Sequence, residues 1–160
     1  ALYHMADLLA PDDGGWTAPY VAPDEAKKIG FGEIGQHGTG TELAIITYGN
    51  GYFLSRQAEM DLRAAGIDLR IIDLRWLHPL NGPAIVAAVA DCRKVLIVDE
   101  SRRSGSLSEK LMTILTEAAR GDSVSRLTAE DCFIPLGPAA ELMLPSRASI
   151  ISAAKSAVSH

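Results

Sequence analysis

Short runs of consecutive apolar residues alternate with segments of helical periodicity from residue 43 onward, and this alternation limits the fold more than any other feature of the chain. The runs are rich in β-branched residues, and we expect them to form strands at Leu43–Tyr48, Leu69–Leu74, Lys94–Val98 and Val124–Leu127. Strands with near-continuous apolar sequence are typical of parallel sheets whose two faces are both buried by helices. The alternation therefore predicts an α/β domain built on a parallel sheet.

The expected helices carry their own start and stop signals. Gly66 is predicted to end the first helix, and Asn81 is predicted to cap the second, with Pro83 in its first turn. The segment Ser106-Leu-Ser-Glu109 matches a capping box, and Ser146 is predicted to cap the last helix. Because crossovers between parallel strands are right-handed, these elements predict a doubly wound, mostly parallel, Rossmann-like sandwich.

Residues 1–41 differ from the rest of the chain. Proline and glycine recur through them and interrupt any periodicity. We interpret residues 1–41 as an extended connector or arm that carries Trp16 and Tyr20, with one short strand at Lys28–Glu33. The predicted organisation is thus an arm over residues 1–41 and a single α/β domain over residues 42–160.

Charge and composition exclude several classes of partner. The formal net charge is -5 and no run of Lys or Arg occurs, whereas a nucleic-acid binder needs a basic surface, so we expect no nucleic-acid partner. No apolar run is long enough to cross a bilayer, and residues 1–10 lack the basic start of a signal peptide, so we expect no membrane partner. Cys92 and Cys132 are far apart in sequence, and we interpret both as ordinary buried thiols of a reducing, cytoplasmic compartment.

A partial dinucleotide fingerprint follows the first expected strand. Gly49 and Gly51 stand where a strand leads into a helix, and Asp73 follows 24 residues after Gly49. However, Leu54 occupies the position of the third glycine, which normally lets helix and strand pack closely. A plain strand-to-helix turn is the simpler interpretation. A small nucleotide-binding or regulatory module stays open as the alternative function.

The sequence completes no metal site and no nucleophile constellation. The histidines are scattered along the chain and none pairs with another ligand at metal-binding spacing: His4, His37, His78 and His160. No serine lies in a G-x-S-x-G context. The segment Ser104-Gly105-Ser106 does not match this motif, and helix capping already explains Ser106. We therefore assign no catalytic, cofactor-binding or metal-ligating residue to this chain.

Charged residues at the expected strand ends are the remaining candidates. Asp99 and Glu100 end the third strand, where they would pair with Arg102 or Arg103, receive a partner or handle a proton. Arg75 ends the second strand, and an arginine there suits recognition of a carboxylate or another anion. Solvated ion pairs are the competing interpretation for all three residues.

Several segments together carry a family resemblance. Residues Ile72–Leu80 (IDLRWLHPL) are similar to the signature IDLRTLxPxD, and Val95–Glu100 followed by Gly105 is similar to the stretch that comes after it. Thr47-Tyr-Gly49 resembles the start of the same domain, and Ala1-Leu-Tyr3 resembles the end of the domain before it. In this order the segments resemble the C-terminal domain of transketolase-like thiamine diphosphate enzymes. The nearest branch is the beta subunit, or beta half, of the decarboxylating component of 2-oxo acid dehydrogenase complexes.

Departures from the family pattern accompany the resemblance, which covers about residues 28–158 and is less typical over Ser146–His160. Asn81 stands where the family usually has Asp, and both residues cap a helix. Ser104-Gly105-Ser106 replaces a double glycine.

The resemblance implies a parent enzyme with its active site elsewhere. In that family thiamine diphosphate and Mg²⁺ are held by two other domains, and the C-terminal domain binds no cofactor. The implied reaction is oxidative decarboxylation of pyruvate or a branched-chain 2-oxo acid, with transfer of the acyl group to lipoyl-lysine. The 160-residue chain alone is then expected to be inactive, with Arg75, Asp99 and Glu100 as interface or site-rim residues.

The resemblance also implies partners and location. Expected partners are the other domains or subunits of the same enzyme, in a homodimer or an α2β2-type assembly, together with the dihydrolipoyl acyltransferase core. The expected location is the cytoplasm, or the mitochondrial matrix in a eukaryote. The same domain from a transketolase or xylulose-phosphate synthase relative is a further alternative.

Overall fold

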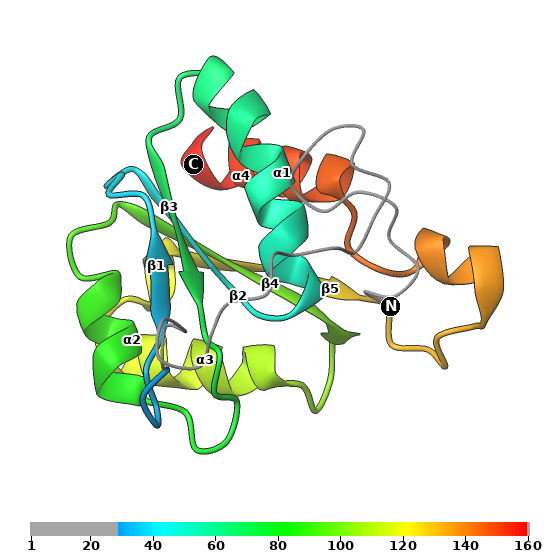
Figure 1. Ribbon diagram of the computed structural model, residues 1–160, viewed down its shortest axis with the longest axis horizontal. Helices are drawn as coiled ribbons and strands as arrows, with labels where there is room; N and C mark the ends of the chain where they lie inside the picture. The colour runs from blue at the N-terminus through cyan, green and yellow to red at the C-terminus, as the bar shows by residue number, and fades with distance from the viewer. Residues whose placement is uncertain (1–28, 160) are drawn as a thin grey trace, which may run out of the picture.

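The computed structural model describes residues 29–159, and within them strands and helices alternate as the sequence predicts (Figure 1). No helix among these residues has the length and apolar character needed to span a membrane. In chain order the elements are β1 (Gly35–His37), β2 (Leu43–Thr47), α1 (Asn50–Ala64), β3 (Leu69–Asp73), α2 (Gly82–Ala88), β4 (Lys94–Arg102), α3 (Leu107–Glu117), the 3-10 turn η2 (Gly121–Ser123), β5 (Val124–Ala129), the 3-10 segment η3 (Gly137–Leu142) and α4 (Arg147–Ser159).

The strands form one sheet in the order β1-β3-β2-β4-β5. Strands β2, β3, β4 and β5 are parallel, and β1 joins the edge antiparallel to β3. The chain moves from β2 outward to β3 and then returns to place β4 on the other side of β2. This reversal confirms the doubly wound, mostly parallel sheet and sets its switch point between β2 and β4.

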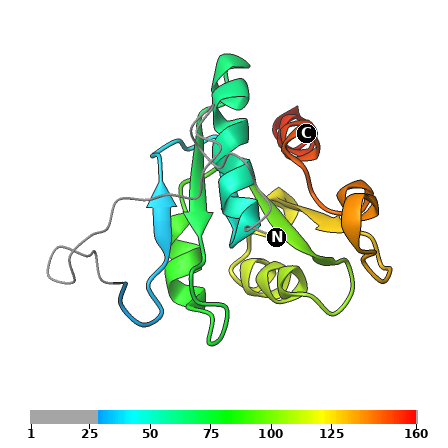
Figure 2. The same cartoon turned by 45° about the vertical axis from the view of Figure 1, so that its right-hand side comes forward.

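Helices cover both faces of the sheet, with α1 and α4 on one side and α2 and α3 on the other (Figures 1 and 2). Successive residues of each strand point to opposite faces, so Leu43 and Ile45 pack toward α1 and α4 while Ala44 and Ile46 pack toward α2 and α3. All four are fully buried. Each large apolar side chain buried in this way contributes about 1.5–3 kcal/mol, which is why these runs form central strands.

The helix-end signals mostly act as predicted. Gly66 has a left-handed backbone (φ +85°) just after α1, and the Ile67 amide donates to the Leu62 carbonyl at 3.0 Å, which closes the helix. Asn81 Oδ1 accepts from the Ala84 amide at 3.2 Å at the start of α2. The predicted cap of α4 also forms, since Ser146 Oγ accepts from the Ser149 amide at 3.1 Å.

The capping box predicted at α3 is wrong in its detail. The Ser106 hydroxyl contacts Ser108 Oγ at 2.7 Å instead of capping the helix, and Glu109 Oε2 accepts from the Gly105 amide at 3.0 Å. The Ser108 amide, an early donor of the helix, is satisfied by Asp99, from the end of β4. A carboxylate distant in sequence thus replaces the local cap.

The short strand predicted at Lys28–Glu33 is also wrong. Lys28 lies outside the described residues, and the chain turns at Phe31 and Gly32 before it forms β1. Gly32 has a left-handed backbone (φ +72°), which ends any extended run there. The last part of the predicted connector therefore contributes an edge strand, while Trp16 and Tyr20 lie outside the described residues.

Candidate functional site

The candidate site lies at the carboxyl ends of β2 and β4, where the strand order reverses. Ligands of doubly wound sheets bind in this position, because the first turns of two helices open there. The structure brings Asp99 and Glu100 to it from the end of β4, opposite Tyr48 and Gly49 from the end of β2.

Asp99 is only 1% exposed, and three donors inside the fold satisfy its carboxylate. Its Oδ1 accepts from Tyr48 Oη at 2.7 Å and from the Ser101 amide at 2.8 Å, and its Oδ2 accepts from the Ser108 amide at 2.9 Å. Burial opposes ionisation, but the bonds from Tyr48, Ser101 and Ser108 outweigh it and lower the pKa of Asp99. Burial, together with the charge of Asp99, raises the pKa of Tyr48 to about 12, so its hydroxyl keeps its proton.

The Glu100 side chain lies near the start of α1. Its Oε1 lies 3.8 Å from the position that a Cβ on Gly49 would take, and Gly49 is the N-cap residue of α1. Its carboxylate accepts no hydrogen bond within residues 29–159. Burial raises the pKa of Glu100, and the neighbouring charge of Asp99 raises it further.

These two carboxylates oppose the nucleotide-binding alternative. A pyrophosphate would need the amides at the start of α1 or α3, and negative side chains already face both helices. Gly51 serves packing, because a Cβ there would collide with Thr47 Oγ1. Asp73, the expected ribose ligand, is engaged with Arg75, whose amide lies 3.4 Å from its Oδ1. Burial raises the pKa of Asp73. The glycines therefore make a tight strand-to-helix turn.

Arg75 does not join Asp99 and Glu100 but clamps the segment that leads into β1. Its Nη1 donates to Glu33 Oε1 at 2.8 Å, and its Nε lies 3.7 Å from Asp73 Oδ2. The guanidinium covers Gly35, where a Cβ would come within 2.7 Å of Nη2. Both partners are partly exposed, so the ion pair with Glu33 is a weak source of stability.

An exposed aromatic surface adjoins Arg75. Trp76 Nε1 donates to the Gly30 carbonyl at 3.0 Å, and the Phe31 ring stacks on Trp76 with centroids 4.9 Å apart. Phe31 is 74% exposed, and the aliphatic side chains of Ile29 and Leu77 are exposed as well. We call these four residues the aromatic edge. Aromatic residues beside an arginine are the composition of binding hot spots in protein interfaces.

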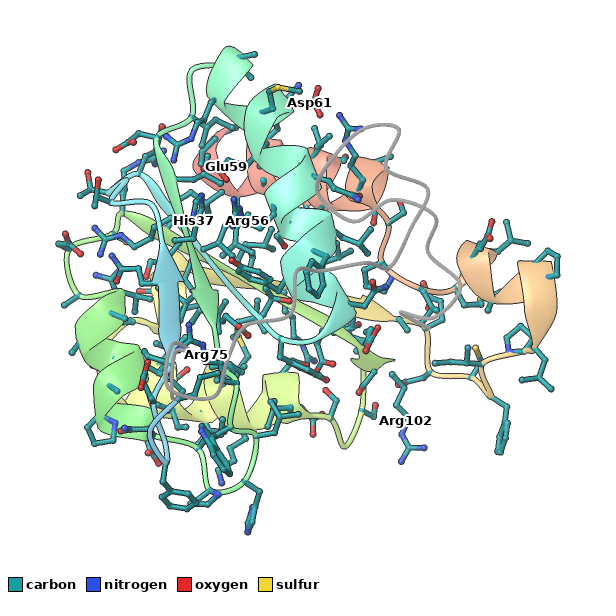
Figure 3. The ribbon with its side chains drawn as sticks, viewed as in Figure 1. His37, Arg56, Glu59, Asp61, Arg75 and Arg102 are labelled. Atoms are coloured by element: carbon teal, nitrogen blue, oxygen red, sulfur yellow. The ribbon has the colours of Figure 1, made fainter. Side chains whose placement is uncertain are left out.

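The other titratable residues stand apart from this site. His37 Nε2 lies 3.0 Å from Glu59 Oε2 on α1, which Arg56 Nε also approaches at 3.3 Å (Figure 3). Among the described residues no group of three or more His, Cys, Asp or Glu could hold a metal ion. His4 and His160 lie outside the described residues. Cys92 is buried as predicted, whereas Cys132 is exposed, which corrects the prediction that both thiols are buried.

Sequence reasoning placed the two acids but missed their partners. Tyr48 lies 51 positions before Asp99 in the sequence, so nothing local linked the two residues. Ser108 was interpreted only as part of a capping box. The strand order supplies the missing signal, since neighbouring parallel strands bring their carboxyl ends together. Glu33 and Trp76, which hold the segment before β1, had no sequence signal of their own.

Comparisons with known proteins agree with this geometry. The family model described as "Transketolase, C-terminal domain" matches residues 32–150. The pyruvate dehydrogenase E1 component subunit beta of Staphylococcus aureus (strain Mu50) is 29% identical over 136 residues, which is 83% of this chain and 42% of that protein. The subunit of the same name from Staphylococcus epidermidis (strain ATCC 12228) is 28% identical over the same length. The chain thus spans less than half the length of these curated relatives.

Two solved structures share the fold. A split gene transketolase, described as an inactive beta4 tetramer, superposes with a TM-score of 0.76 at 20% identity and covers 91% of this chain and 48% of its own. The 2-oxoglutarate:ferredoxin oxidoreductase from Magnetococcus marinus superposes with a TM-score of 0.58 at 20% identity, over 79% of this chain and 20% of its own. At this identity the likeness concerns the fold alone.

Proposed function

This chain belongs to the family of transketolase C-terminal domains, and we propose that it is the assembly domain of a thiamine diphosphate-dependent 2-oxo acid dehydrogenase. The parent enzyme would decarboxylate pyruvate or a branched-chain 2-oxo acid and pass the acyl group to lipoyl-lysine. Its distant relationship to pyruvate dehydrogenase E1 beta subunits favours this branch over the transketolase and xylulose-phosphate synthase branches.

The observation that carries the proposal is the pair of carboxylates at the switch point. Asp99 caps α3 and Glu100 faces the first turn of α1, so the two places where this fold binds a diphosphate face negative charge. The residues present therefore do not fit thiamine diphosphate, nor do the described residues offer a ligand group for Mg²⁺. The cofactor and the chemistry belong to other domains of the parent enzyme.

The carboxyl edge of the sheet is then a docking surface within the enzyme. Glu100 accepts no hydrogen bond within the described residues, and burial raises its pKa, so a cation from a neighbouring domain would stabilise its charged form. Arg75 and the aromatic edge lie at the same end of the sheet and offer an apolar surface with a charged rim. We assign Arg75 and Glu100 to this interface, with Asp99 buried beneath it as the cap of α3 and therefore at its rim only through Tyr48 and Ser101.

The proposed partners follow from the same role. They are the cofactor-binding domains or subunits of the enzyme, a second copy of the chain in a homodimer or α2β2-type assembly, and the dihydrolipoyl acyltransferase core. The proposed location is the cytoplasm, or the mitochondrial matrix in a eukaryote.

Immunodepletion tests the proposal in cell extract. An antibody raised against this chain should remove thiamine diphosphate-dependent release of CO₂ from carboxyl-labelled pyruvate or branched-chain 2-oxo acids, because the domain and the active site belong to one assembly. A pre-immune antibody is the control. Depletion of the chain that leaves both activities intact would overturn the proposal.

A further inference from the structure

A groove opens at the amino end of the sheet, between α4 and the edge strand β5. Its volume is about 310 Å³, and it is lined by the second half of α4, the first residues of β4 and β5, and part of η2. This volume lies at the lower end of the range for small-molecule sites. The groove is separate from the proposed docking surface, because Glu100 and Arg75 lie at the carboxyl ends of their strands. It therefore suits a small ligand rather than a folded partner.

Small side chains leave this space open. On β5, Ser125 pairs with Leu96 of β4, and Leu96 points to the face of the sheet that α1 and α4 cover. Neighbouring residues of parallel strands share a face, so a serine lies where a larger apolar side chain would fill the gap beneath α4. The residues of α4 that line the groove are also small: Ala153, Ser156 and Ala157. The groove consequently reaches down to Leu96, which belongs to the core.

Lys94 brings an unpaired cation to the groove. It lies two residues before Leu96 on β4, so its side chain is directed to the same face of the sheet. It lines the groove and is half-buried, and its ammonium forms no hydrogen bond or ion pair among residues 29–159. Arg126 also lines the groove, but its Nη1 donates to the Arg103 carbonyl at 3.1 Å and contacts Ser108 Oγ at 3.3 Å. Lys94 is therefore the cation that a ligand in the groove would meet.

Asp122 brings an unpaired carboxylate to the same groove. It lies in η2, is exposed, and accepts no hydrogen bond from the part of the chain that the structure describes. Asp122 and Lys94 both line the groove, yet they form no ion pair with each other. A cation and an anion thus lie around a floor formed by Leu96, and both lack a partner within the described residues. This arrangement complements a small molecule that carries both charges and an apolar group.

We propose that the groove binds an α-amino acid with a small apolar side chain. The carboxylate of the ligand pairs with Lys94, its ammonium group pairs with Asp122, and its side chain covers Leu96. A simple carboxylate would approach the negative charge of Asp122, and a simple amine would approach the positive charge of Lys94, so the groove selects against both. The inference does not depend on the proposed function, because neither charged residue belongs to the docking surface.

Titration of the ¹⁵N-labelled chain with L-leucine, followed by NMR, tests the proposal. Leucine should cause saturable shifts confined to amides of η2, the start of β5 and the second half of α4, with a dissociation constant below about 1 mM. N-acetyl-L-leucine lacks the ammonium group and L-leucinamide lacks the carboxylate. Each of these analogues should bind at least about tenfold more weakly than leucine, because each leaves one charge of the groove unpaired.

Substitutions in the groove give a second readout. Lys94→Met and Asp122→Asn should each raise the dissociation constant for leucine by about tenfold or more. Ser156→Leu should prevent binding, because the larger side chain occupies the groove. Lys110→Met is the matched control, since Lys110 is exposed on α3 on the other face of the sheet, and it should leave the constant unchanged. None of the four side chains is buried, so the NMR spectrum of each variant should show a folded protein.

Three results would overturn the proposal. The first is the absence of saturable shifts at leucine concentrations about ten times the expected dissociation constant. The second is equal binding of leucine and either analogue, which would remove the assigned charge pairs. The third is a set of shifts outside the groove, or Lys94→Met behaving like Lys110→Met. The proposed function is judged separately by the immunodepletion experiment.

Discussion

Replacement of Asp99 by Asn is the sharpest test of how the switch point is built. The carboxylate accepts from Tyr48 and Ser101 through Oδ1 and from Ser108 through Oδ2. An Asn of the same shape offers one acceptor oxygen and one NH₂ group, so its NH₂ must face an N–H or O–H donor inside the fold. A donor left unpaired in a buried site costs about 1–3 kcal/mol, and bonds to a charged group are stronger than those to an amide.

We therefore expect Asp99→Asn to lower the free energy of unfolding by about 2–3 kcal/mol, which is a fall in Tm of roughly 5–10 °C for a chain of this length. Urea denaturation at neutral pH measures it. Asp122→Asn is the control, because Asp122 is exposed in η2 and should have almost no effect. An Asp99→Asn protein as stable as wild type would refute the idea that this carboxylate is a buried cap.

The pH dependence gives the same test a second readout. Because the folded pKa of Asp99 is lowered, its stabilisation is fully present above its ordinary pKa of about 3.9 and is lost as the pH falls through the lowered value. The stability difference between wild type and Asp99→Asn should stay constant from about pH 5 to about pH 8 and narrow below about pH 4. A stability difference between the two proteins that instead narrows between neutral pH and pH 5 would contradict the lowered pKa of Asp99.

Three further substitutions test other parts of the account. Glu100→Gln should raise the Tm of the isolated chain at pH 7, because burial raises the pKa of Glu100 and its charged form therefore destabilises the folded state above that pKa. Thermal unfolding near pH 4, where Glu100 is protonated, should show no such gain. A lower Tm of the variant at pH 7 would contradict this reasoning. Gly51→Ala should lower the free energy of unfolding in urea by about 1–3 kcal/mol, since its Cβ would meet Thr47 Oγ1. Gly82→Ala is the control and should lower it much less, because a Cβ there makes only ordinary contacts. Equal effects of the two substitutions would contradict the packing role of Gly51. Arg75→Ala should change Tm by no more than about 2 °C, since its ion pair with Glu33 is partly exposed, and a large fall in Tm would show that the clamp is structural.

Features that depend on neighbours in sequence were predictable. The buried strands are recognisable in the sequence as apolar runs such as Leu43–Thr47. The helix caps at Gly66, Asn81 and Ser146 depend on residues only a few positions away. The order of strands and helices then leaves few topologies, because crossovers are right-handed. The fold class and the family resemblance follow from this local information.

Features that depend on distant contacts were not predictable. The cap of α3 comes from Asp99 rather than from Ser106, because a buried carboxylate competes successfully with a local hydroxyl. β1 has only three residues and gains its bonds from β3, so it has no periodicity of its own to detect. Cys132 is exposed because it lies in the segment between β5 and α4, which no sequence pattern separated from the core.

The thiamine diphosphate content of the native assembly tests the central claim most directly. An antibody against this chain would capture the assembly, and oxidation of any bound thiamine diphosphate to a fluorescent thiochrome would measure the cofactor. The recombinant 160-residue chain, incubated with thiamine diphosphate and Mg²⁺ and then washed, is measured in parallel. We predict cofactor in the captured assembly and none on the isolated chain. A captured assembly without the cofactor, or an isolated chain that retains it, would contradict the account.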